Sequence, residues 1–137
     1  MNAVGAIRKL ILDDAATVAL LFDNTSVYPV VLPQQKTYPA VTLAITNTKP
    51  NDSKTQISGV DNVMVVVRVF ASTYDRVQQI DTEIRRVIDG FNGTVTTSDS
   101  ETHKFHEIRF LAREDGFDEE NKLFVRIANY DVRYYWQ

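Results

Sequence analysis

Two histidines three residues apart, His103 and His106, form the one pair in this sequence whose spacing suggests metal ligands. The surrounding segment, residues 103–112, alternates apolar and polar side chains, which predicts a β-strand. Residues three apart on a strand point to opposite faces, so the two imidazoles would diverge rather than share an ion. We interpret them as two partly exposed strand histidines and predict no metal site.

Five carboxylates crowd residues 114–121 around Gly116 and could attract a hard cation such as Ca²⁺. The alternating ligand positions and the distal glutamate of a calcium-binding loop are missing, which favours a solvated hairpin turn. The sequence contains no nucleophile elbow, P-loop, dinucleotide-binding glycine motif or zinc-protease motif. We therefore identify no catalytic residue, no cofactor-binding residue and no cofactor.

Composition narrows the class of protein. The chain has 137 residues, 44% of them apolar, which predicts one globular domain over residues 1–137. It has no cysteine, which excludes disulfides and thiolate chemistry. The net charge of −3 without a Lys/Arg cluster disfavours a nucleic-acid-binding protein. No apolar run reaches the roughly 18 residues of a membrane span, and the start does not resemble a signal peptide, so we expect a soluble intracellular product without a membrane partner.

Hydrophobic periodicity and turn residues predict the elements that would carry any site. In chain order we expect helical turns over 4–22 with a possible new cap at Asp13 or Asp14, an extended proline-containing link over 28–39, a strand over 40–46, a long polar loop over 47–59, a strand over 60–71, a helix over 73–89, a polar connection over 92–101, a strand over 103–112, an acidic turn over 114–121 and a final strand over 122–136. This order predicts an α+β fold, a largely antiparallel sheet of about four to five strands with helices packed on one face.

The helix over 73–89 is the most clearly patterned element. Ser72 begins a capping-box-like sequence, and Gly90 suits the left-handed residue that follows a helix. Arg85 and Arg86 are expected to pair with Asp81 and Asp89 on a solvated face. The apolar stripe that we expect to be buried consists of Val77, Ile80, Ile84, Val87 and Ile88.

The strands carry two finer expectations. In the strand over 40–46, Ile45 shares a face with Val41 and Leu43, which predicts that it is buried with them. In the last strand the apolar phase changes by one residue between Ile127 and Tyr130. Such a slip predicts a bulge near residues 128–129 or burial on both faces.

Three blocks, in this order, resemble the phage tail completion proteins, also called tail terminators, of long-tailed phages. The resemblance covers nearly the whole chain and lies in the order and spacing of structural motifs. The blocks are Val27-Tyr28 with Leu32-Pro33-Gln34 and Tyr38-Pro39-Ala40-Val41; Val67-Arg68-Val69-Phe70-Ala71-Ser72-Thr73-Tyr74 with Asp89-Gly90-Phe91-Asn92-Gly93; and Arg113-Glu114-Asp115-Gly116-Phe117-Asp118 before a strand that ends in aromatic residues.

The resemblance implies a structural virion protein without catalytic residue or cofactor. It implies a homo-oligomeric, hexameric ring at the head-proximal end of the tail tube, which ends tube polymerisation and docks to the head connector. Its partners would be the tail tube protein and the head–tail connector protein, and DNA would only pass through the lumen. The protein would reside in the virion tail, and in the host cytoplasm during assembly. The candidate interface residues are Tyr28, Lys49, Asn51, Asp52, Lys54, Gln56, Thr97, Asp99 and Glu101.

A second class of function stays open at this point. A small-ligand-binding or enzymatic α+β module, using His103 or His106, would need a concave apolar pocket with convergent polar groups. A ring protein would instead need a surface that closes on copies of itself.

Overall fold

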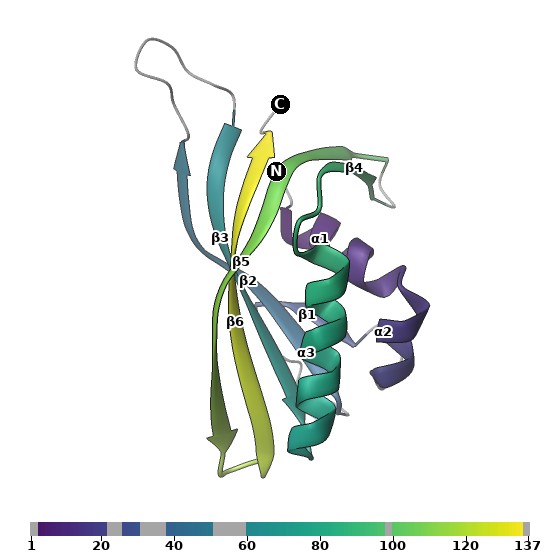
Figure 1. Ribbon diagram of the computed structural model, residues 1–137, viewed down its shortest axis with the longest axis vertical. Coiled ribbons are helices and arrows are strands. Elements are labelled where there is room, and N and C mark those ends of the chain that lie inside the picture. The colour runs from purple at the N-terminus through teal and green to yellow at the C-terminus, as the bar shows by residue number, and fades with distance from the viewer. Residues whose placement is uncertain (1–2, 22–25, 31–37, 51–59, 98–99, 136–137) are drawn as a thin grey trace.

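The fold is described from a computed structural model, which describes residues 3–21, 26–30, 38–50, 60–97 and 100–135 (Figure 1). No helix in these residues is long and apolar enough to cross a membrane. The elements are α1 (Ala3–Leu12), α2 (Ala15–Leu20), β1 (Val27–Pro29), β2 (Ala40–Pro50), β3 (Val60–Ala71), α3 (Tyr74–Ile88), β4 (Gly93–Thr96), β5 (Thr102–Asp118) and β6 (Leu123–Tyr135).

The described strands form one six-stranded sheet in the order β1-β2-β3-β6-β5-β4. Only β1 and β2 run parallel, and every other neighbouring pair is antiparallel. The sheet is strongly twisted and forms a half-barrel, with α3 lying beside it (Figure 1). The expected α+β class and the predominance of antiparallel pairs are therefore confirmed, in a mixed sheet.

Two parts of the expected architecture are wrong. The sheet has six strands rather than four to five, because β1 and β4 are short edge strands in segments whose proline, glycine and threonine content is typical of connections. The helices do not simply cover one face of the sheet. α1 and α3 contact strands, whereas α2 packs chiefly against α1 and α3.

Two strands run further than their hydrophobic patterns indicate. β2 continues to Pro50, into the segment expected to be a loop, and β5 continues to Asp118. The acidic residues 114–118 are therefore paired with β6 rather than forming a turn, and the chain reverses over residues 119–122. Ladder hydrogen bonds extend these strands beyond the part that packs in the core, so apolar alternation does not mark their ends.

The expected phases of β2 and β6 need correction. Ile45 lies opposite Val65, but its side chain is 40% exposed because it stands beyond the part of β2 that pairs with β1. β6 keeps one phase from Arg126 onward, with Arg126 and Ala128 buried. Its register with β3 is continuous, and the irregularities lie opposite it on β5, so the expected bulge at 128–129 is wrong.

The N-terminal caps of α2 and α3, and the residue that follows α3, can be compared with the expected signals. The Asp14 side chain accepts a hydrogen bond from the backbone N–H of Thr17, so α2 is a separate helix. α3 is capped by Thr73, which accepts from Arg76 N, one residue later than the expected Ser72. Gly90 follows α3 at a φ of 81°, the left-handed conformation predicted for it.

The core lies between α1, α3 and the sheet. Four of the five expected α3 residues are fully buried, and Val87 is only partly so. They pack with the inward side chains of β3 and with Tyr130 of β6. The fully buried α3 residues of the stripe are Val77, Ile80, Ile84 and Ile88.

Replacement of Ile84 by alanine tests this packing. Ile84 is 0% exposed, so Ile84→Ala leaves a cavity and should lower the free energy of unfolding by about 2–5 kcal/mol. Urea denaturation followed by circular dichroism measures the change. Gln78→Ala, at an exposed position of the same helix, is the matched control and should change it by less than about 0.5 kcal/mol. Equal midpoints for both variants would show that α3 does not pack as described.

Candidate assembly surface

A fully buried carboxylate stands on the sheet-facing side of α3. Asp81 lies 3.3 Å from the guanidinium of Arg113 and 3.5 Å from that of Arg126. Neither Asp81 oxygen has a hydrogen-bond partner within the described residues, so charge attraction at these longer distances holds it. The expected pair of Arg85 with Asp89 is confirmed, but the expected pairing of Asp81 on a solvated face is wrong, because Asp81 is buried beside Arg113 and Arg126. Arg86 pairs with both Asp14 and Glu83.

Arg126 connects this carboxylate to the outer part of the β5–β6 hairpin. Its Nε donates to Asp115 Oδ1 at 2.7 Å, and its Nη2 donates to Asp115 Oδ2 at 3.2 Å. Nη2 also donates to the Tyr74 hydroxyl at 2.9 Å, and that hydroxyl donates to Asp115 Oδ2 at 2.8 Å. The hydrogen bond from Arg126 is the main cause that lowers the pKa of Asp115 below its ordinary value.

Aromatic rings surround these charges. The guanidiniums of Arg85 and Arg113 stand over the ring of Phe110, at 3.9 and 4.8 Å from its centroid. At the outer end of the hairpin, Phe124 contacts Tyr74 and Phe117 edge to face, with centroids 6.0 and 5.0 Å apart. Beneath Phe110, the buried Tyr130 hydroxyl has a pKa raised by loss of solvation. The network therefore attaches the start and middle of α3 to the hairpin.

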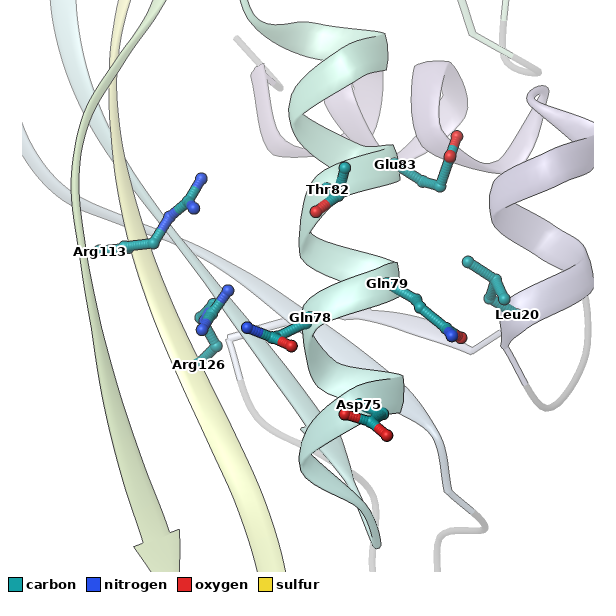
Figure 2. Close-up of a pocket in the computed structure, with 8 residues that line it drawn as sticks. All are labelled: Leu20, Asp75, Gln78, Gln79, Thr82, Glu83, Arg113 and Arg126. Carbon is teal, nitrogen blue, oxygen red and sulfur yellow. The ribbon is translucent and has the colours of Figure 1, made fainter.

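A groove with a volume of about 590 Å³ lies beside this network. Figure 2 shows the residues that line it. Arg113 and Arg126 lie on its strand side, and Gln78 points toward Arg126 from α3, whereas Gln79 and Glu83 point toward α2. Leu20 is the one apolar residue in the lining, so the groove lacks the apolar walls that small-ligand sites have. The full lining is Leu20, Asp75, Gln78, Gln79, Thr82, Glu83, Arg113 and Arg126.

The two histidines lie on opposite faces, as predicted. His106 is exposed, but His103 is only 3% exposed, so the expectation of two partly exposed residues is wrong for it. β4 pairs with β5 at this point and covers His103, whose Nδ1 lies 2.7 Å from the Tyr134 hydroxyl. In the part of the chain that the structure describes, no three His, Asp or Glu side chains group as a metal site.

The candidate interface residues fall in separate places. Tyr28 lies on β1 and Lys49 on β2, while Thr97 and Glu101 lie between β4 and β5. The backbone N–H of Thr97 donates to the Glu101 carbonyl at 2.9 Å, so the structure brings these two together. The remaining candidates, Asn51, Asp52, Lys54, Gln56 and Asp99, lie outside the described residues.

Sequence reasoning missed the ionic network. Asp81 occupies an α3 position next to the buried Ile80, and Arg126 stands at a buried position of β6. One available signal was that Arg126 shares its alternation with Tyr130 and Val132, which are the inward residues of the strand. A charged residue in an inward phase indicates a buried ion pair.

Replacement of Asp81 by alanine tests the network. Asp81→Ala leaves Arg126 buried with Asp115 as its remaining carboxylate, and should lower the free energy of unfolding by about 3 kcal/mol. Asp75→Ala, at an exposed position in the first turn of the same helix, is the control and should cost less than about 1 kcal/mol. Urea unfolding measures both, and a loss for Asp81→Ala no larger than for the control would contradict the assignment.

Comparisons with known proteins identify the family of this chain. A family model described as tail completion protein gp17 matches residues 5–135. A chain from the virion of a native gene transfer agent particle has the same fold, with a TM-score of 0.71 and 17% sequence identity over 94% of this chain and 91% of that one. No curated relative matches the sequence. This chain therefore belongs to the tail completion protein gp17 family, and it is a structural phage tail protein of the virion rather than an enzyme.

Proposed function

We propose that this protein forms a ring that caps the head-proximal end of the phage tail tube. There it ends tube polymerisation and docks to the head connector. The observation that carries the proposal is the family match over residues 5–135. The similar chain from a gene transfer agent virion supports it, because that particle is also a multi-subunit assembly.

Six copies, as the family resemblance implies, would surround a lumen through which DNA passes. The net charge of −3 supports this role, because an acidic protein gives DNA phosphates no strong attachment. The tail tube protein would bind one side of the ring and the connector protein the other. Assembly would take place in the host cytoplasm.

The candidate interface residues stay a prediction within this proposal. Tyr28 on β1, and Thr97 and Glu101 between β4 and β5, are candidates that the structure describes. Lys49 stands near the end of β2, where the chain enters residues 51–59. These positions would contact a neighbouring subunit or a tail protein.

A phage that lacks this gene tests the function. Its tubes should grow past their normal length and stay unjoined to heads, because nothing stops polymerisation or presents a docking surface. Electron microscopy of the lysate measures tube length and joining, and the purified protein should form rings with a central hole at high concentration. Supplying the parent chain from a plasmid is the control and should restore joined particles. Tails of normal length on heads without the protein would disprove the proposal.

A further inference from the structure

One edge of the sheet is open along the outer part of β5. β4 pairs with β5 only over Thr102–Phe105. Further along, the Ile108 N–H and carbonyl bond with the backbone of residues 90–91, and Phe110 N donates to the Asp89 carboxylate. Beyond this point, residues 111–118 have no backbone partner on that side within the described chain. We call these residues the β5 open edge.

The opposite edge is open along the second half of β2. β1 pairs with β2 only over Val41–Leu43, and Val30 N donates to the Leu43 carbonyl. From residue 44 to residue 50, no described residue pairs with β2 on its outer side. We call residues 44–50 the β2 open edge. The two open edges have nearly equal lengths, about 24–27 Å at the usual rise of a strand.

Exposed apolar side chains gather at these two edges. Among the described residues, Ile45 (40% exposed) and Val30 (63%) lie at the β2 side, and Leu111 (45%) and Phe117 (48%) lie in the β5 open edge. The fifth large apolar side chain that is exposed, Tyr74, lies beside Phe124, which contacts Phe117. An open edge with exposed apolar residues is a template for pairing with a strand of another chain, unless charges, prolines or bulges prevent it.

The usual protection of an edge is weak on β5. No proline interrupts residues 111–118. Two of the charged residues, Arg113 and Asp115, are already paired with Asp81 and Arg126 in the network beside α3. That network therefore holds the hairpin in place and leaves its outer backbone free.

Strand directions show what can cover each edge. β2, β3, β6 and β5 are each antiparallel to the next, so β5 runs opposite to β2. A second copy placed in the same orientation along the sheet brings its β2 antiparallel to this β5. The charges also match, because residues 111–118 contain three acids and one arginine, whereas residues 44–50 contain one lysine and no acid.

The offset between the edges favours closure into a ring. The β2 open edge lies toward one end of the long axis and the outer part of β5 toward the other (Figure 1). Pairing them therefore staggers neighbouring sheets and tilts their strands. Closed β-barrels need such a tilt and stagger. The contact joins two different surfaces, and contacts of this kind form rings when their rotation closes.

We propose that residues 111–118 of one copy pair antiparallel with residues 44–50 of the next, so that the sheets of all subunits join into one continuous barrel. The proposal rests on the proposed ring and names the surfaces that close it. Ile108 directs both backbone groups outward, and outward residues alternate along a strand. The register of β5 with β6 shifts between Phe110 and Ala112, and the alternation resumes after this shift. The β5 residues whose backbone N–H and C=O groups point outward, toward β2 of the next copy, are therefore Arg113, Asp115 and Phe117.

Cysteine cross-linking tests the pairing, since the chain has no cysteine of its own. Glu114 and Asn47 are exposed, and both lie on the sheet face opposite α3. The double variant Glu114→Cys with Asn47→Cys, treated as rings with a short thiol-reactive cross-linker, should give a ladder of oligomers on denaturing gels. Each single variant should run as a monomer on the denaturing gel, because β5 pairs with β2 of the next copy and not with another β5. Glu114→Cys with Thr82→Cys, an exposed position on α3, is the control pair and should give no ladder.

The outcomes separate the two proposals. Rings of the parent chain with a ladder only for the double edge variant support edge pairing. Rings without that ladder, a ladder for the control pair, or dimers of Glu114→Cys alone overturn edge pairing and leave the ring intact. Absence of parent rings overturns the ring and the edge pairing together. A second double variant, Ala112→Cys with Asn47→Cys, tests a register shifted by two residues, because Ala112 lies two residues before Glu114 on the same face of β5. It also replaces the first double variant if that variant fails to fold.

Discussion

A carboxylate buried beneath α3 determines how the helix and the β5–β6 hairpin lie together. Asp81 has lost its water, and the guanidiniums of Arg113 and Arg126 are the charges that compensate it. Removing one partner of a buried pair is costly, so the helix and the hairpin cannot shift independently. Arg126 carries the constraint outward to Asp115 and Tyr74 through hydrogen bonds of 2.7–3.2 Å. The outer hairpin is thus held by these polar contacts together with the ring contacts of Phe124.

Local sequence rules correctly predicted the features whose determinants lie within a few residues of each other. The α3 stripe, the Asp14 cap and the left-handed Gly90 each depend on neighbours less than one or two helical turns away. β1 and β4 were missed because three or four residues with proline, glycine or threonine become strands only when a partner strand lies beside them. The length of β5 was missed for the same reason, since pairing with β6 extends it through an acidic sequence.

The site was less predictable than the fold. The order of motifs in the sequence correctly indicated the tail completion family, and with it a structural protein rather than an enzyme. It did not indicate where the sheet edges stay open, because an open edge is set by where neighbouring strands end. The exposure of Ile45 and Phe117 likewise depends on where the neighbouring strands end, although the alternation pattern of their own strands would predict burial. Surfaces for assembly therefore emerge from topology more than from local composition.

Hydrogen exchange measured by mass spectrometry, on the free chain and on the assembled ring, tests most directly whether these edges carry assembly. The outward amides of the β5 open edge have no partner in the described chain, so they should exchange fast in the free protein. In the ring, exchange over residues 111–118 and 44–50 should slow by about tenfold or more, because new ladder bonds protect the amides. Unchanged exchange at both edges in a ring that has formed would contradict the account.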